Sequence, residues 1–132
     1  MKNTLNVVER NKKNVRAFYE IGIDASFFHR DFIITAPDYL PWGGTAKGAD
    51  AYLGNVVVQA KKALDFSRLT IESIVAEDDN VVLLIHVGVA GTDAMIRISE
   101  HWVVVNDKAL SLWVAYFEPK ALMDQLIKTN VS

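Results

Sequence analysis

The stretch from Ala94 to Phe117, AMIRISEHWVVVNDKALSLWVAYF, decides the fold that the sequence predicts. β-Branched and aromatic residues fill it on both sides of Asn106-Asp107-Lys108, a run that is typical of a turn. The stretch therefore predicts a β-hairpin with strands over 94–105 and 110–117.

The length of the hairpin loop decides which residues of the two strands face each other. A three-residue loop pairs Val105 with Ala109 and places His101 opposite Trp113, within side-chain contact. A two-residue loop places those two side chains on opposite faces of the sheet. The sequence leaves both arrangements open.

Alternation and helical spacing predict elements along the rest of the chain. Helices are expected over 5–23, 26–30, 48–64 and 119–127, and further strands over 31–35, 68–76 and 81–90. The last four strands make three successive antiparallel hairpins. Helices first and a strand meander afterwards indicate a single α+β domain over residues 1–132.

The glycine-rich stretch Pro41–Gly48, PWGGTAKG, holds three of the chain's seven glycines beside an indole ring. Gly43 and Gly48 have the spacing of a phosphate-binding loop, but Ala49 and Asp50 follow instead of lysine and a hydroxyl residue, so nucleotide binding is excluded. We expect the stretch to form the rim of a small-molecule pocket, with Trp42 folded over the opening, because glycines let the backbone turn sharply.

Composition excludes several classes of function. The chain has 132 residues, 51% of them hydrophobic, which suits one domain with one core. A net charge of −2 gives no electrostatic footprint for nucleic acid. The absence of cysteine and three histidines without paired spacing predict no metal site, and we expect no cofactor. Short apolar runs and no signal-like start predict a cytoplasmic protein that does not enter a membrane.

Four segments carry a resemblance to a known family. They are NKKNVRAFYE, APDYLPWGGTAKGADAYL, AEDDNVV and the closing WVAYFEPKALMDQL. In this order and spacing the chain resembles the SnoaL-like branch of the nuclear-transport-factor-2-like superfamily, which includes polyketide cyclases and is related to ketosteroid isomerase and limonene epoxide hydrolase. The resemblance covers nearly the whole chain. It implies a cystatin-like cone, in which a strongly curved sheet wraps on helices around an apolar pocket.

The resemblance also implies which residues line the pocket. In ketosteroid isomerase an aspartic acid of the oxyanion hole lies four residues before the end of the penultimate strand, and the matching position here is His101. Odd-numbered residues of that strand then face the pocket, because side chains alternate along a strand. The expected ligand-binding residues are Tyr19, Trp42, Ile85, Val87, Ser99, Val103, Trp113 and Phe117.

A catalytic base at the end of the first strand is implied as well. Strand alignment puts Ala36 there and counting back from Gly48 puts Asp38 there, so only Asp38 could serve. An apolar pocket raises the proton affinity of a carboxylate, which suits a base beside a carbonyl, with His101 donating to the enolate oxygen. Directly after Pro37, Asp38 is more simply a turn residue, and His101 could be a pocket residue without chemistry.

Two functions follow from these alternatives. The first is a cofactor-independent isomerase or cyclase that transfers a proton next to a carbonyl of a small apolar or aromatic substrate. The second is a non-catalytic binding or assembly domain for a hydrophobic ligand or a protein partner. The direction of Asp38 separates them, because a carboxylate outside the pocket leaves no base. Epoxide hydrolysis is excluded, since the matching positions Leu83, Ile85 and Ala115 are apolar.

The expected outer face of the sheet predicts a homodimer. A face in contact with water alternates apolar and polar residues, and this one is too apolar to be left exposed. A second copy is the simplest cover. The positions expected there are Val82, Leu84, His86, Ile96, Ile98, Trp102, Val104, Leu112 and Val114.

Overall fold

The computed structural model describes residues 4–22 and 25–131 of the chain. Within them, six strands form a single sheet in the order β2-β1-β6-β5-β4-β3. The strands are β1 (Phe28–Ala36), β2 (Gly44–Lys47), β3 (Leu64–Glu77), β4 (Asn80–Val89), β5 (Met95–Val105) and β6 (Lys108–Phe117). Only β1 and β6 pair in parallel, so the sheet is mixed, and the three predicted hairpins from β3 to β6 are confirmed.

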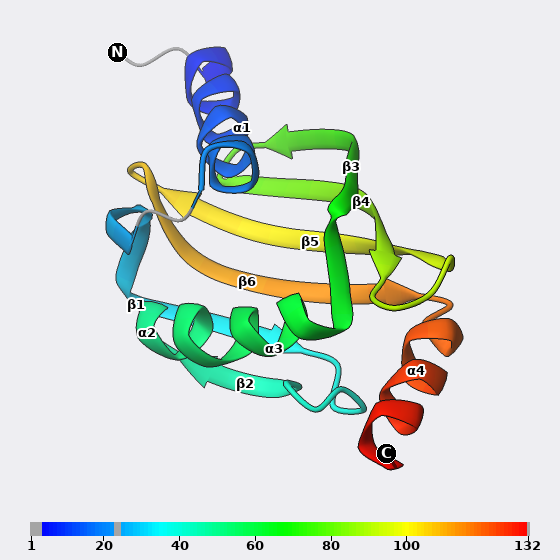
Figure 1. Ribbon diagram of the computed structural model, residues 1–132. Coiled ribbons are helices and arrows are strands. Elements are labelled where there is room, and N and C mark those ends of the chain that lie inside the picture. Colours follow the sequence, from blue (N-terminus) through cyan, green and yellow to red (C-terminus); the bar gives the residue numbers. More distant parts are fainter. Residues whose placement is uncertain (1–3, 23–24, 132) are drawn as a thin grey trace.

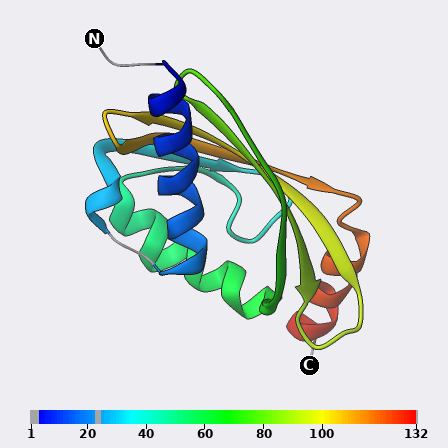
Figure 2. The same ribbon diagram turned by 90° about the horizontal axis from the view of Figure 1, so that it is seen from above.

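Helices cover one face of the curved sheet, which we call the inner face. Figure 2 shows α1 and α3 on the same side of the strands. The helical elements are α1 (Thr4–Glu20), the short 3-10 turn η1 (Ala25–Phe27), α2 (Ala49–Ala51), the π-helical turn η2 (Tyr52–Val56), α3 (Val57–Ala63) and α4 (Lys120–Val131). The α+β cone that the sequence predicts is therefore confirmed. No helix of the described residues is long and apolar enough to cross a membrane.

Two expected elements need correction. Residues 26–30 form no helix beyond η1, because β1 already begins at Phe28. The glycine-rich stretch is only partly a loop, since Gly44–Lys47 pairs with β1 as the antiparallel strand β2. Ile23, the last residue of the expected first helix, lies outside the described residues, and α1 ends at Glu20.

A bulge sets the register of the β5–β6 hairpin. Its loop has two residues, Asn106 and Asp107, both in the left-handed region with φ of 51° and 64°, as a tight hairpin turn requires. Leu110 is then an extra residue on β6, and it shifts the register so that His101 still pairs with Trp113. Both expected arrangements are therefore partly realised: the loop is short, and the pairing is that of the longer loop.

The even-numbered residues of β5 point to the inner face, whereas the resemblance implied that the odd-numbered ones face the pocket. A strand buries one alternate set of side chains, and here the even set carries the larger apolar groups. The odd set includes Arg97, Ser99 and His101, whose polar groups remain partly or fully exposed. The buried even set is Ile96, Ile98, Glu100, Trp102 and Val104.

An aromatic cluster around Trp102 joins the helices to the sheet. Trp102 is 1% exposed, and its ring lies 5.5 Å from that of Phe18 on α1 and 5.9 Å from that of Phe27 on η1. The rings of Phe28 and Phe32 on β1 are both 6.4 Å away. Aromatic pairs at these separations contribute about 0.5–1.5 kcal/mol each beyond the burial of their area. The cluster thus fixes α1 and β1 against β5.

A bend divides β3 into two parts. The register against β4 shifts between Asp65 and Thr70, and Figure 1 shows β3 turning sharply midway. At the bend, the Arg68 guanidinium donates to the carbonyl oxygens of Val89 and Thr92 at 3.0 and 2.9 Å. These charge-assisted hydrogen bonds hold the bend in place.

Gly43 is required by a close backbone approach in the loop between β1 and β2. A Cβ atom there would lie 2.0 Å from the carbonyl oxygen of Pro37. The same loop is tied by two backbone hydrogen bonds, from Leu40 to Pro37 at 3.1 Å and from Gly43 to Leu40 at 2.9 Å. The loop folds back on itself at a point where only glycine fits.

We predict opposite effects for two glycine substitutions. Gly43→Ala should lower the free energy of unfolding by about 2–4 kcal/mol, because the obstructing atom belongs to the backbone and cannot move aside cheaply. Gly54→Ala should raise it by about 0.5–1 kcal/mol, because this helical site has no atom within 4 Å of an added Cβ. Urea denaturation of both variants measures the difference, and effects of the same sign would contradict this account.

Candidate functional site

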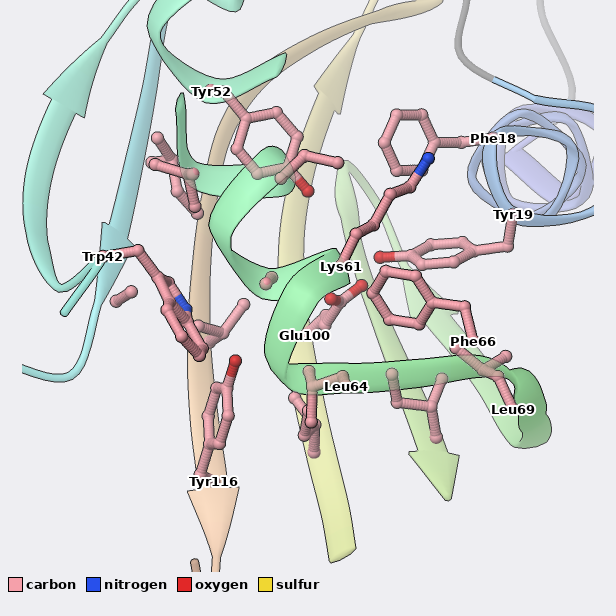
Figure 3. Close-up of a pocket in the computed structure, with 18 of the residues that line it drawn as sticks. Phe18, Tyr19, Trp42, Tyr52, Lys61, Leu64, Phe66, Leu69, Glu100 and Tyr116 are labelled. Atoms are coloured by element: carbon pink, nitrogen blue, oxygen red, sulfur yellow. The ribbon is translucent and has the colours of Figure 1, made fainter. Parts of the chain in front are cut away.

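A cavity of about 310 Å³ lies between the helices and the inner face of the sheet (Figure 3). Every strand except β2 contributes to its lining, together with α1, η2 and α3. Most of the lining is apolar. The polar groups among the lining residues belong to Tyr19, Trp42, Tyr52, Lys61, Glu100 and Tyr116.

The cavity opens beside the end of α1 and the bend of β3. Its exposed lining residues are Gly22, Lys61 and Phe66. Trp42 is only 6% exposed, so it forms an inner wall and does not fold over the mouth as the sequence predicted. Its indole also lines a second hollow, shared with Lys62 on α3 and residues of α4, and so separates two spaces.

Glu100 is the one acidic residue among the described residues that line the cavity. It is 9% exposed, and its Oε1 has no hydrogen-bond partner within the described residues. Burial raises the pKa of Glu100 to about 8, and the nearby indole N–H of Trp102 acts in the opposite direction. Glu100 is therefore mainly protonated and uncharged at pH 7.

Three phenols accompany this acid. The Tyr19 hydroxyl is buried and has no partner among the described residues. Burial raises the pKa of Tyr52 and of Tyr116, so both stay neutral hydrogen-bond donors. Tyr116 is also close enough to Glu100 for a negative charge there to raise its pKa further, while the indole N–H of Trp42 lowers it. The cavity thus presents neutral donors to an apolar space.

Asp38 does not belong to this site. It is exposed in the turn after β1 and is not among the cavity-lining residues, so the proposed base at this position is wrong. The physical reason is that the chain must reverse after Ala36 to form β2, and proline followed by aspartate suits such a turn. The turn interpretation of Asp38 is the one that the structure supports.

The sequence also placed His101 and its neighbours wrongly. The ring of His101 stacks on that of Trp113 at 3.6 Å, with 2° between the planes, on the outer face of the sheet. Its Nε2 lies 3.0 Å from the Ser99 hydroxyl. Partial burial lowers the pKa of His101, as expected, but no cavity group faces it. Because alternation carries them to the same outer face, Ser99, Val103, Trp113 and Phe117 also lie outside the cavity.

Three expected ligand-binding residues, Tyr19, Trp42 and Ile85, do line the cavity. Val87 faces inward and is fully buried, but it lies in the core beyond the cavity wall. Sequence reasoning missed Glu100, although a signal was present: it shares its strand face with Ile98 and Trp102. Choosing the face by apolar content would have placed this acid in the pocket.

The described residues contain no group of three or more His, Asp or Glu side chains that could hold a metal ion. Comparisons with known sequences give no match, neither to a family model nor to a curated protein. Comparisons with solved structures match nearly the whole chain.

Three of these structures represent the matches. A protein described as a SnoaL-like polyketide cyclase, from Jannaschia sp. CCS1, is 12% identical with a TM-score of 0.73, over 93% of this chain and 95% of its own. A nuclear-transport-factor-2-like protein of unknown function from Burkholderia pseudomallei is 18% identical with a TM-score of 0.68, over 90% and 95%. TerC, co-crystallised with polyporic acid, is 21% identical with a TM-score of 0.69, over 87% and 98%.

The similarity to these structures establishes the fold. It does not indicate which reaction or ligand the cavity serves. A de novo designed protein with a curved β-sheet matches almost as well, at 14% identity and a TM-score of 0.67. A backbone of this shape is therefore compatible with many different pockets. What distinguishes this chain is the set of groups that its own residues place in the cavity.

We predict that Glu100→Gln makes the protein more stable near neutral pH. The carboxyl has a pKa of 4.5 when unfolded and about 8 when folded, so its contribution to stability is fully present below pH 4.5 and is lost as pH rises to 8. Glutamine has no such dependence. The advantage of the variant should therefore grow between pH 5 and 8, to at most about 5 kcal/mol. Urea denaturation of both proteins at pH 5, 7 and 9 tests this, and a constant difference would contradict it.

Proposed function

We propose that this nuclear-transport-factor-2-like fold holds a small apolar or aromatic molecule and transfers a proton at the carbon next to its carbonyl group, as a cofactor-independent isomerase or cyclase. The observation that carries the proposal is Glu100, a buried acid without a partner for Oε1, in a mostly apolar cavity. Structures of similar fold support small-molecule binding, since one is described as a polyketide cyclase and another was crystallised with polyporic acid.

Glu100 has the properties of a proton carrier. With a pKa of about 8, roughly a tenth of the molecules carry the ionised form at pH 7, so both forms are accessible. The ionised carboxylate takes a proton from the carbon beside the carbonyl, and the resulting acid returns it to a neighbouring position. The hydroxyl of Tyr116 stands in the same cavity to donate to the enolate oxygen.

A non-catalytic binding domain is the second candidate. Asp38 lies outside the cavity, which removes the base that the resemblance implied. A protonated Glu100 can also serve as a simple hydrogen-bond donor to a ligand carbonyl, without any proton leaving its oxygen. The two functions share one cavity and differ in whether Glu100 exchanges its proton with the bound molecule.

The exchange of hydrogen for deuterium in 2-tetralone, a bicyclic ketone, distinguishes the two functions. We expect the wild-type protein to accelerate exchange beside the carbonyl in D₂O, measured by NMR, and to do so faster as pH rises through about 8. Glu100→Gln should lose about 10²–10⁴-fold of this acceleration. Glu72→Gln, at an exposed acid paired with Arg97 on the outer face, should retain it. Equal exchange rates in the wild type and the Glu100 variant would contradict the proton-transfer function and support the non-catalytic binding domain.

We also propose a homodimer through the outer face of the sheet, with a revised set of residues. The structure places six residues of the expected outer set on the inner side: Ile96, Ile98, Trp102, Val104, Leu112 and Val114. Large apolar groups nevertheless remain on the outer face, because Leu84, Trp113 and Phe117 are 40%, 51% and 62% exposed. Such a patch is typical of an interaction surface.

Sedimentation velocity tests this dimer. The wild-type protein should sediment as a dimer at micromolar concentration, and Trp113→Asp should sediment as a monomer, because a charge in the centre of an apolar interface loses its hydration without a partner. Ile127→Asp, at an exposed apolar residue of α4, is the matched control and should stay dimeric. A monomeric wild type would contradict the proposal.

A further inference from the structure

Lys61 gives the mouth of the cavity a positive charge. Among the described residues that line the cavity it is the only cationic one, and it is exposed. Within the described part of the chain, none of the ion pairs or side-chain hydrogen bonds involves its ammonium group. Figure 3 shows its side chain rising from α3 along the cavity, with the ammonium on the side of Phe18.

The Tyr19 hydroxyl is a second unused donor at this end of the cavity. It is buried and has no hydrogen-bond partner in the described residues. In Figure 3 it points from α1 toward the Glu100 carboxyl and the stem of Lys61. A buried polar group without a partner costs about 1–3 kcal/mol, so an acceptor supplied by a ligand would recover this energy.

The charge is unevenly distributed between the mouth and the interior. The interior holds a mainly protonated carboxyl and the neutral phenols of Tyr52 and Tyr116, whereas the mouth holds the ammonium of Lys61. Aromatic rings of Phe18 and Phe66 form the walls beside the mouth. This arrangement fits a molecule with an uncharged aromatic body and one anionic end.

We propose, building on the function proposed above, that the ligand is an aromatic carboxylate. The Lys61 ammonium and the Tyr19 hydroxyl hold its carboxylate at the mouth, as two donors suited to two acceptor oxygens. Its ring system enters the cavity between the aromatic walls and reaches toward Glu100. A cavity of about 310 Å³ is near the lower limit of ligand pockets, which favours a body of two fused rings.

The orientation of the ligand follows from this anchor. A carboxylate held by the Lys61 ammonium at the mouth leaves the interior to the uncharged ring system, so the carbonyl at which proton transfer occurs is on the ring system. An anion placed in the interior would instead lose its hydration without a cation beside it, which is unfavourable. Lys61 and Tyr19 are thus positioned to select the orientation as well as the charge of the ligand.

The pair 2-naphthoate and 2-naphthamide tests the proposal, because the two molecules have nearly the same shape and differ in charge. We expect calorimetry at pH 7 to show that the wild-type protein binds the naphthoate about five- to tenfold more tightly. Lys61→Met should remove this preference by weakening naphthoate binding while leaving the amide within about twofold. Lys61→Arg should restore the preference, and Tyr19→Phe should reduce it.

Lys62→Met is the matched control, since Lys62 is also exposed on α3 but lines the second hollow and not the cavity. It should change neither affinity. Equal binding of the two probes by the wild type, or equal losses in the Lys61 and Lys62 variants, would overturn the anionic ligand while leaving the cavity function intact. Failure of both probes to bind would overturn the cavity function as well. Thermal midpoints confirm that each variant is folded.

Discussion

The burial of Trp102 is the constraint on which the rest of the structure depends. Its ring contacts aromatic side chains from α1, η1 and β1, so a single residue of β5 fixes these three elements against the sheet. Because side chains alternate along a strand, the inward direction of Trp102 also decides the direction of its neighbours. Glu100 must then point into the cavity, and His101 must point to the opposite face.

The elements were largely predictable from sequence, and the site was not. Hairpins and amphipathic helices depend on local patterns, which is why the meander from β3 to β6 and the first and last helices were placed well. Which side chains of β5 face inward depends on whether the odd- or the even-numbered residues pack against α1 and β1, which are distant in the sequence. The match to the strand of ketosteroid isomerase selected the odd-numbered residues, and the structure buries the even-numbered ones. The bulge at Leu110 adds a second non-local effect, since it restores a pairing that the short loop alone would not allow.

The cavity retains polar atoms that the fold itself does not satisfy. Glu100 Oε1, the Tyr19 hydroxyl and the Trp102 indole N–H are all buried without normal partners among the described residues. Such groups lower stability, and natural proteins keep them mainly where function requires them. Two of the three groups, the Glu100 carboxyl and the Tyr19 hydroxyl, belong to residues that line the same apolar cavity. This shared location is expected of a binding site and not of scattered packing defects. A ligand that satisfied these atoms would also stabilise the fold by mass action.

The pairing of β1 with β6 has a consequence for how the chain folds during synthesis. The hairpins from β3 to β6 join neighbouring segments and can form as each strand emerges, whereas Phe28 of β1 pairs with Ala109 of β6, far along the chain. Until β6 has left the ribosome, β1 can pair only with the short strand β2. The cavity therefore closes late, and until then the nascent chain exposes the apolar side chains of β1.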